Sequence, residues 1–353
     1  MKKNVGIYLL LLSMPYMALW AQEPFYEVAD KDVLNKAYEE RHYKIKVTFR
    51  VVDEQGEPVS DADIDVGIDS LLHADGYNNY KGKTGPTGLF TVESRGRGCT
   101  EVLVQKIGCY ESRPDVRWDG RLNPGGAEMH KNGGFRPWNP TIDVMIKKIG
   151  KPIPMIVRLG EGGTNSWLKP NADQLEKELG WDLVEGDWVA PHGRGKMTDL
   201  IFRFESSYTD ESNKMAKVNI RFANPNDGLV SIKELKGEES RLKYPREAPL
   251  QGYENKNIEL VSKVFEDWRK LKNRPQAYLL RIRTQKDVTG NIVSALYGKI
   301  TKPYRLFPPA IRYRLPTLNF DYYLNPTPND RNLEYDQRNN LAPEADRGLT
   351  WPP

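Results

Sequence analysis

One cluster in this sequence combines the residue types of an active site. Trp181-Asp182, Asp187-Trp188 and His192 fall within twelve positions, and an aspartate beside a histidine orients it as a general base. Asp187 and His192 are therefore the catalytic candidates. A structural interpretation fits the same residues and is the one we favour. Pro191-His192-Gly193 forms a turn, and the two tryptophans pack in a core or between domains.

Oxygen-bearing side chains gather in two other segments, Asn224-Pro225-Asn226-Asp227-Gly228 and Asn325 to Asp336. Calcium takes six to eight oxygen ligands, which makes Asp227 and Asp330 candidate ligands. Asn, Asp, Pro and Gly are also the residues that ordinary turns require. We favour turns, and expect no metal and no cofactor.

Several tryptophans have no obvious strand face to fill. Trp118, Trp138 and Trp167 lie among Gly, Pro and Asn residues. Flat apolar rings beside polar groups suit sugars, so these three, with Trp181 and Trp188, are candidate glycan-binding residues. The alternative, which we favour, is that they hold long loops against the β-sheets.

The motifs of common catalytic classes are missing from the sequence. No HExxH, CxxC, Walker A or GxSxG motif occurs, and Gly193-Arg194-Gly195-Lys196 lacks the flanking residues of a phosphate loop. No two histidines share a short metal-ligand spacing; they are His42, His73, His130 and His192. Metalloproteases, nucleotide enzymes and α/β-hydrolases are disfavoured. A carboxylate-pair glycosidase stays open, because its two acids need not be close in sequence.

The first residues predict export. A basic Met1-Lys2-Lys3, an apolar run from about Val5 to Ala18 and a small residue before Gln22 describe a signal peptide over residues 1–21. A retained anchor is the alternative, but a spanning helix usually needs about 20 apolar residues. Removing two lysines lowers the formal charge from +4 to +2, and no Lys/Arg block resembles a nucleic-acid footprint. We expect a periplasmic or extracellular bacterial protein with no nucleic-acid partner and no membrane span after cleavage.

The two cysteines, Cys99 and Cys109, flank a predicted strand. The ends of such a strand lie about 30 Å apart. A disulfide needs Cα atoms within about 7 Å. We therefore predict two unpaired thiols.

From residue 44 onward the apolar residues recur with a period of two. Val47, Phe49 and Val51 alternate with polar residues, a turn follows at 53–58, and the alternation resumes over 62–68. One buried and one solvated face is typical of an antiparallel sheet. Further strands are predicted at 89–92, 102–104 and 139–146.

These residues also resemble a known family. The run Val51–Val59 is similar to the opening of carboxypeptidase regulatory-like domains, as is Lys83–Val92 followed by Lys106-Ile107-Gly108. The resemblance covers about residues 46–110 and implies a seven- or eight-stranded transthyretin-like β-sandwich. Two positions depart from the family: Gly85-Pro86 replaces an acidic residue, and Cys109 replaces an aromatic one. These motifs are turn and core signals, so the resemblance implies a fold and no chemistry.

The second half of the chain predicts more strands and two short helices. Asn171 caps a helix that ends before Gly180, and a second helix begins near Asn257, with apolar residues at helical spacing from Ile258 to Leu271. Strands are predicted at 200–204, 217–222, 229–232, 278–284, 292–297 and 318–323. The clearest hairpin joins 277–285 to 292–300. Residues 187–195, 296–300 and 322–334 also resemble a pattern in uncharacterised exported bacterial proteins, which implies no activity.

Together these features predict a mainly β protein, a transthyretin-like or Ig-like sandwich plus a second β-rich domain with one or two short helices. The predicted parts are a signal peptide (1–21), a helical segment (22–43), the sandwich (44–150, with an inserted loop at 115–136), a connector with a short helix (151–197), the second domain (198–338) and a tail (339–353). The leading function is a noncatalytic binding or structural protein whose partner is a polysaccharide or a cell-envelope protein. The alternative is a secreted hydrolase of polysaccharide or peptide, with its site in the second domain.

Overall fold

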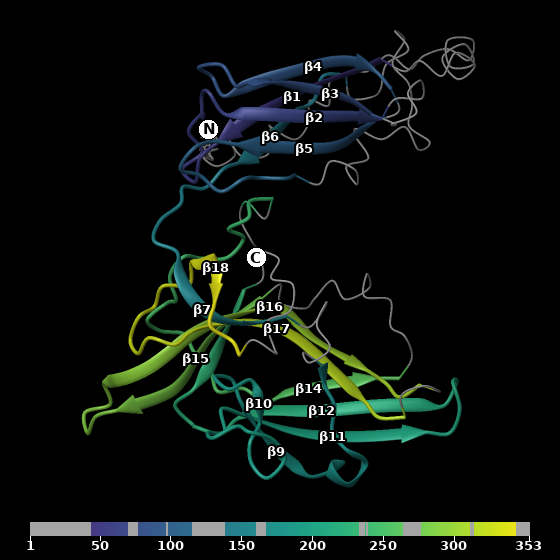
Figure 1. The fold of residues 1–353 in the computed structure, drawn as a ribbon, viewed down its shortest axis with the longest axis vertical. Helices are drawn as coiled ribbons and strands as arrows, with labels where there is room; N and C mark the ends of the chain where they lie inside the picture. The colour runs from purple at the N-terminus through teal and green to yellow at the C-terminus, as the bar shows by residue number, and fades with distance from the viewer. Residues whose placement is uncertain are drawn as a thin grey trace, which may run out of the picture. The chain divides into compact units, whose positions relative to one another are not determined.

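The computed structural model describes residues 44–69, 77–96, 98–114, 138–159, 167–232, 237, 239–263, 277–310 and 314–343. They divide into two compact units (Figure 1). Unit 1 takes its residues from 44–105 and 113–144, and unit 2 from 106–112 and 145–343. The predicted signal peptide, the helical segment 22–43, the loop 115–136 and the end of the tail lie outside the described residues.

Unit 1 consists of two three-stranded sheets. Their orders are β4-β1-β6 and β3-β2-β5, with antiparallel pairing of β1 to β4 and of β2 to both neighbours. The strands are β1 (Lys44–Val52), β2 (Asp63–Asp69), β3 (Tyr77–Lys83), β4 (Leu89–Arg95), β5 (Cys99–Gln105) and β6 (Thr141–Met145). The predicted alternation fills the core, as Val47, Phe49 and Val66 are fully buried. Gly82 lets the sheets approach, because a Cβ there would lie 2.4 Å from the Phe90 ring.

Unit 2 contains a five-stranded and a seven-stranded sheet (Figure 1). The five-stranded sheet has the order β10 (Asp187–Trp188), β9 (Glu178–Asp182), β11 (Leu200–Tyr208), β12 (Lys214–Phe222), β14 (Ile258–Ser262). The larger sheet has the order β13 (Gly228–Ile232), β15 (Ala277–Lys286), β16 (Ile292–Phe307), β17 (Thr317–Asn325), β7 (Ile153–Arg158), β18 (Tyr335–Asn340), with β8 (Trp167–Leu168) also on β17. Among the described strands of unit 2, β7 and β18 pair in parallel, and the other paired strands run antiparallel. The predicted fold class is confirmed: the described chain is mainly β.

Two apolar cores hold unit 2 together. One lies between the sheets and includes Phe202, Phe204 and Phe320, and the other includes Met155 and Tyr323. Adjacent residues of β17 belong to different cores, so both faces of this strand are covered and all nine of its residues are buried. Charged side chains at such a strand must find partners inside the protein.

The six strands predicted in the second half are present, and so is the hairpin. β15 pairs with β16 in antiparallel register, and its turn is closed by the Asp287 N–H on the Asn291 carbonyl at 2.9 Å. The register shifts between Ile282 and Gln285, and at this bulge Arg283 has a positive φ of 53°. A bulge bends its strand and re-aims a side chain.

The predicted helix from Ile258 is wrong over its first turn. Ile258–Ser262 is strand β14, which pairs with Ala216–Ile220 of β12. The apolar spacing favoured a helix, but the backbone N–H and C=O groups of this segment form their hydrogen bonds with the edge of β12, which is distant in sequence. The rest of that prediction, from 264 to 271, lies outside the described residues.

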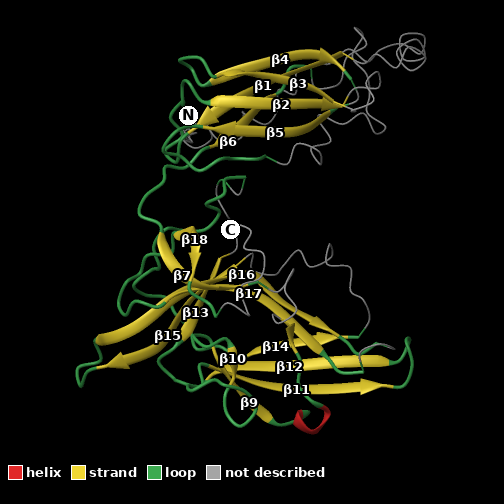
Figure 2. Ribbon diagram, in the orientation of Figure 1, coloured by secondary structure: helices red, strands yellow, loops and turns green. Residues whose placement is uncertain are grey.

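The helix predicted after Asn171 shortens to the single 3₁₀ turn Ala172–Gln174, the red segment of Figure 2. The side chain of Gln174 accepts the Asn171 N–H at 2.7 Å, so the predicted start is correct. Gly180 was expected to end the helix but lies inside β9. A Cβ there would stand 2.5 Å from the hydroxyl of Thr198, which explains the glycine by close packing.

The segment predicted as a connector, residues 151–197, supplies β7 to β10 of unit 2. Cys99 begins β5 and Cys109 lies in a turn, and the two are not joined by a disulfide. No helix among the described residues is long and apolar enough to cross a membrane.

Candidate functional site

The catalytic candidates Asp187 and His192 lie in the same turn but bond to different partners. The Asp187 carboxylate accepts the backbone N–H groups of Trp188 at 2.8 Å and Arg194 at 3.1 Å. The exposed His192 holds its Nδ1 2.8 Å from the side-chain nitrogen of Gln174. An amide nitrogen only donates, so Nδ1 is the acceptor and the ring proton sits on Nε2. Asp187 therefore shapes the turn, and Gln174 orients the imidazole.

Two of the five candidate tryptophans belong to the core. Trp181 is buried, and its ring meets that of Trp188 edge-on at 5.0 Å. Trp188 in turn packs edge-on against Phe202 at 5.8 Å. Trp138 is half-buried just before β6, Trp167 begins β8, and Trp118 lies outside the described residues. Trp181 and Trp188 thus contact each other within unit 2, whereas Trp138 belongs to unit 1.

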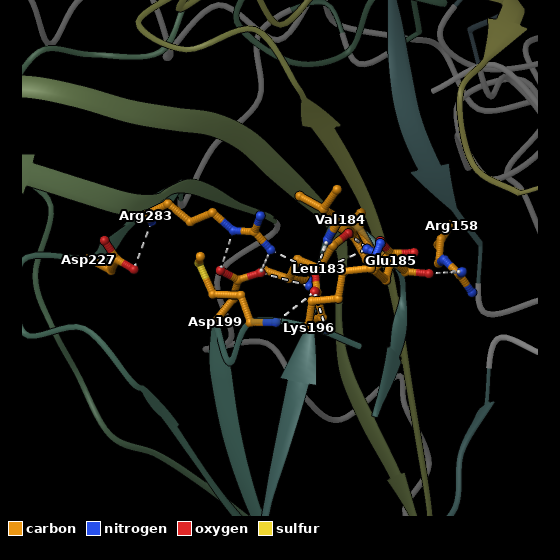
Figure 3. A network of polar contacts seen from close by, with 11 residues as sticks. Arg158, Leu183, Val184, Glu185, Lys196, Asp199, Asp227 and Arg283 are labelled. Carbon is orange, nitrogen blue, oxygen red and sulfur yellow. Dashed lines mark hydrogen bonds and ion pairs between the residues drawn. The ribbon is translucent and has the colours of Figure 1, made fainter. Parts of the chain in front are cut away.

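A polar cluster that sequence reasoning largely missed surrounds Arg283 (Figure 3). Its Nη2 donates to Asp182 at 2.7 Å and to Asp199 at 3.0 Å, and its Nε donates to Asp199 at 2.9 Å. The backbone N–H of Arg283 bonds to Asp227 at 3.0 Å. One arginine thus joins three carboxylates that come from separate segments of the chain.

The bulge in β15 explains how the cluster forms. It lies in the seven-stranded sheet, whereas Asp182 ends β9 and Asp199 directly precedes β11 of the five-stranded sheet. The re-aimed guanidinium therefore ties one sheet to the other across the core of unit 2. Asp227, just before β13, also binds the N–H of Thr284 at 2.8 Å and fixes the backbone of the bulge.

Asp182 has the most hydrogen bonds in the cluster. Besides Arg283, its two oxygens accept four backbone N–H groups at 2.9 to 3.0 Å; they belong to Val184, Glu185, Lys196 and Met197. Burial alone would raise the pKa of Asp182, but these N–H donors and Arg283 outweigh it and lower the pKa below its ordinary value. Asp182 is held as an anion.

Asp199 and Asp227 respond differently. Burial raises the pKa of both carboxyls above the ordinary aspartate value, although Arg283 counteracts it at Asp199 and the Thr284 N–H does so at Asp227. Opposite pKa shifts in neighbouring acids are a property of acid–base pairs. Asp182 and Asp199 are each 1% exposed, however, so no substrate can touch their oxygens without opening the fold. The arrangement fits a structural lock between sheets.

The two calcium candidates use their oxygens within the protein. Asp227 bonds to Arg283, Thr284 and Asn224, and Asp330 accepts the N–H of Asn332 at 3.0 Å. Across the described residues, no three His, Cys, Asp or Glu side chains are grouped to hold a metal ion. Both aspartates have the contacts of turn residues.

A shallow groove of about 500 Å³ lies on the outer face of the β3-β2-β5 sheet in unit 1. Asp65 and Lys81 form an ion pair across it at 2.9 Å, and Lys83 lies 3.4 Å from Asp63. Leu103 on β5 lies beside Asp65, on the side away from Lys81, and adds an apolar side chain to the groove. Such a surface offers both donors and acceptors to a polar ligand, and the spacing of charges along β2 and β3 indicates it from sequence.

No protein-family model matches the sequence, and no curated protein does. Among solved structures, the chain is similar to a DUF3823 family protein from Parabacteroides merdae, with 7% identity, 80% of this chain and 99% of that chain covered, and a TM-score of 0.18. It is also similar to BcpA, the major pilin subunit of Bacillus cereus, with 10% identity, 80% and 96% coverage, and a TM-score of 0.19. These scores carry no argument about function.

Proposed function

We propose that this chain is an exported, noncatalytic binding or structural protein of the bacterial cell envelope. The observation that carries the proposal is the state of its clustered carboxylates. Asp182 and Asp199 are buried and are engaged with Arg283 and with backbone N–H groups. They stabilise the contact between two sheets and do not face a substrate.

A hydrolase would need a different arrangement. A glycosidase holds two carboxyl groups about 5–10 Å apart on either side of the bond that it cleaves, and both must reach the substrate. Asp187 is accessible, but its carboxylate accepts the backbone N–H of Arg194 in the turn that contains His192. The His192 imidazole is hydrogen-bonded to the side chain of Gln174. This geometry gives no support to an acid–base dyad.

The groove of unit 1 is the binding face that we propose for a polysaccharide or an envelope protein. Asp63 and Asp65 on β2 face Lys83 and Lys81 on the adjacent strand β3, and the ion pairs that they form are exposed. Exposed pairs are worth little to stability, so their side chains are able to exchange partners at small cost. A ligand rich in hydroxyl groups or peptide bonds suits such a face.

A pull-down on insoluble polysaccharides and envelope extract, with released sugars assayed in the same tubes, tests the proposal. We expect the mature protein to be retained without release. Lys81→Gln/Lys83→Gln should reduce retention at least threefold, whereas the exposed Lys44→Gln on the other sheet of the same unit should not. Sugar release that disappears in Asp187→Asn or His192→Gln would overturn the noncatalytic proposal, and failure to bind any envelope fraction would overturn the binding role.

Export is tested separately by cell fractionation. We expect to find the protein in the periplasm or medium, with a mass that corresponds to a chain starting at Gln22. A cytoplasmic protein that keeps residues 1–21 would contradict it.

A further inference from the structure

We propose that unit 2 docks on an anionic phospholipid surface through one protruding tip. This isoleucine tip consists of Lys106–Cys109 and Lys148–Lys151. The inference goes beyond the proposed function and rests on it only in placing the protein beside a membrane.

The tip exposes two isoleucines side by side. Ile107 stands at the apex of a turn that is closed by the Cys109 N–H on the Lys106 carbonyl at 3.0 Å, and the residue is 101% exposed. Ile149 is 45% exposed, and its N–H binds the Gly108 carbonyl at 2.9 Å. The sequence Lys-Ile-Gly occurs twice, at 106–108 and 148–150. Antiparallel backbone pairing between Cys109 and Lys148 brings the two copies together.

The apex of the tip projects into open space. Gly108 has a φ of +77°, and a Cβ placed there would meet nothing within 4 Å. A protein interface of standard size buries about 800 Å² on each partner and needs a broader surface. Two aliphatic side chains on a narrow projection fit insertion between lipid headgroups better.

A buried carboxylate holds the base of the tip rigid. Glu334 accepts the hydroxyl of Tyr110 at 2.7 Å and the backbone N–H groups of Gly150 at 2.8 Å and Lys151 at 2.9 Å. Lys147 adds a buried bond from its Nζ to the Leu242 carbonyl at 2.7 Å. Because the tip is already ordered, binding requires little further loss of conformational entropy.

The charges around the isoleucines select an anionic surface. Lys148 and Lys151 are exposed beside Ile149. The buried Glu334 is engaged by its N–H and O–H donors, and Glu111, further down the same ribbon, pairs with Arg241 at 3.2 Å. The tip therefore presents positive charge around an apolar centre. Lysines near a negatively charged leaflet strengthen binding, and aliphatic carbons add to it by leaving water.

Vesicle sedimentation tests the proposal with the mature chain. Vesicles of 30% phosphatidylglycerol in phosphatidylcholine should bind the protein at least tenfold more tightly than pure phosphatidylcholine, and salt should weaken this binding. Ile107→Ser/Ile149→Ser should reduce binding at least tenfold. Lys148→Gln/Lys151→Gln should reduce it about twenty-five-fold, on the order of fivefold for each lysine.

The hairpin turn between β15 and β16 supplies a matched control. Val288 is 105% exposed there and Lys286 is close in sequence, so Lys286→Gln/Val288→Ser removes the same chemistry from another tip and should leave vesicle binding unchanged. Equal melting temperatures would show that the variants are folded. Three results would overturn the proposal. In the first, the protein does not bind the phosphatidylglycerol vesicles; in the second, the control variant loses as much vesicle binding as the tip variants; in the third, the tip binds an acidic envelope protein in place of lipid. The tip variants should still be retained on polysaccharide in the pull-down. That measurement tests the proposed function independently of lipid binding.

Discussion

Replacing Lys299 with methionine should stabilise the protein, and by more at pH 7 than at pH 9. Lys299 lies in β16 and is 0% exposed. Its Nζ donates to the Leu333 carbonyl at 2.9 Å and lies 5.4 Å and 5.1 Å from the ring centres of Tyr244 and Tyr323. Among the described residues, no carboxylate forms an ion pair with this ammonium group, so the cost of burying its charge is incompletely offset.

The size of the effect follows from the shift in its pKa. Burial lowers the pKa of Lys299 from 10.5 to about 7, although the charge of Glu334 acts in the other direction. Between pH 7 and pH 10.5 the unfolded chain therefore binds more protons at this site than the folded protein does, and stability rises with pH. Integrated from pH 7 to pH 9, this difference amounts to about 2 kcal/mol. Below pH 7 both states are protonated and the penalty is constant.

Methionine keeps the length of the side chain and removes the charge. It also leaves the Leu333 carbonyl without its donor, at a cost of about 1 kcal/mol. The penalty that burial of the ammonium group imposes is about 4 kcal/mol at pH 7 and about 2 kcal/mol at pH 9, since the unfolded lysine is still protonated there. After the cost of the unpaired carbonyl, we expect Lys299→Met to raise the free energy of unfolding by about 3 kcal/mol at pH 7 and by about 1 kcal/mol at pH 9.

Urea denaturation of both proteins at pH 7, 8 and 9 measures the difference. Other titrating groups are common to both proteins, so their contributions cancel. The exposed Lys243→Met should change stability equally little at every pH. A difference between wild type and Lys299→Met that stays constant across this range would refute the reasoning, because it would mean that Lys299 keeps its ordinary pKa in the folded protein.

Three further predictions concern stability and reactivity. Arg283→Met should lower the free energy of unfolding by about 3–5 kcal/mol in urea, because it leaves buried carboxylates unpaired; a loss under 1 kcal/mol would contradict the lock. Gly186→Ala should lower the melting temperature by several degrees, since Gly186 has a φ of +61° and a Cβ would stand 1.8 Å from Nε of Arg158; an unchanged melting temperature would count against this. Burial raises the pKa of Cys99 to about 12, so iodoacetamide at pH 8 should label it only after unfolding, and rapid labelling of the native protein, detected by mass spectrometry, would disprove it.

The strands were predictable because their signal is local. A period of two over residues 44–68 requires one buried face, and Val47 and Val66 are buried as expected. The hairpin after Lys286 carries its own turn residues. The helix predicted from Ile258 failed because its competitor is not local: the edge of β12 lies some forty residues earlier in the chain. Apolar spacing alone does not reveal such a partner.

The polar cluster was predictable only in part. Asp182 lies in the segment with the densest functional residue types, but the pairing of an aspartate with a nearby histidine pointed to Asp187 and His192. Lys299 interrupts the apolar stretch 295–300 of β16, and Arg283 directly follows the mostly apolar stretch 277–282 of β15. A cation at such a place is the signal that sequence reasoning passed over. Which of them has a carboxylate partner depends on how two sheets meet, and the sequence of a single strand does not contain that information.

The buried cations Arg283 and Lys299 differ in their consequences for the fold. Arg283 has a bulge that directs it toward Asp182 and Asp199, so its charge is balanced and its position links two sheets. Lys299 has one carbonyl and two rings, so most of its hydration is lost without replacement. Removing a balanced charge exposes its partners to the full cost of burial, whereas removing an unbalanced one abolishes that cost. The same class of substitution, a buried cation to methionine, should therefore destabilise at Arg283 and stabilise at Lys299.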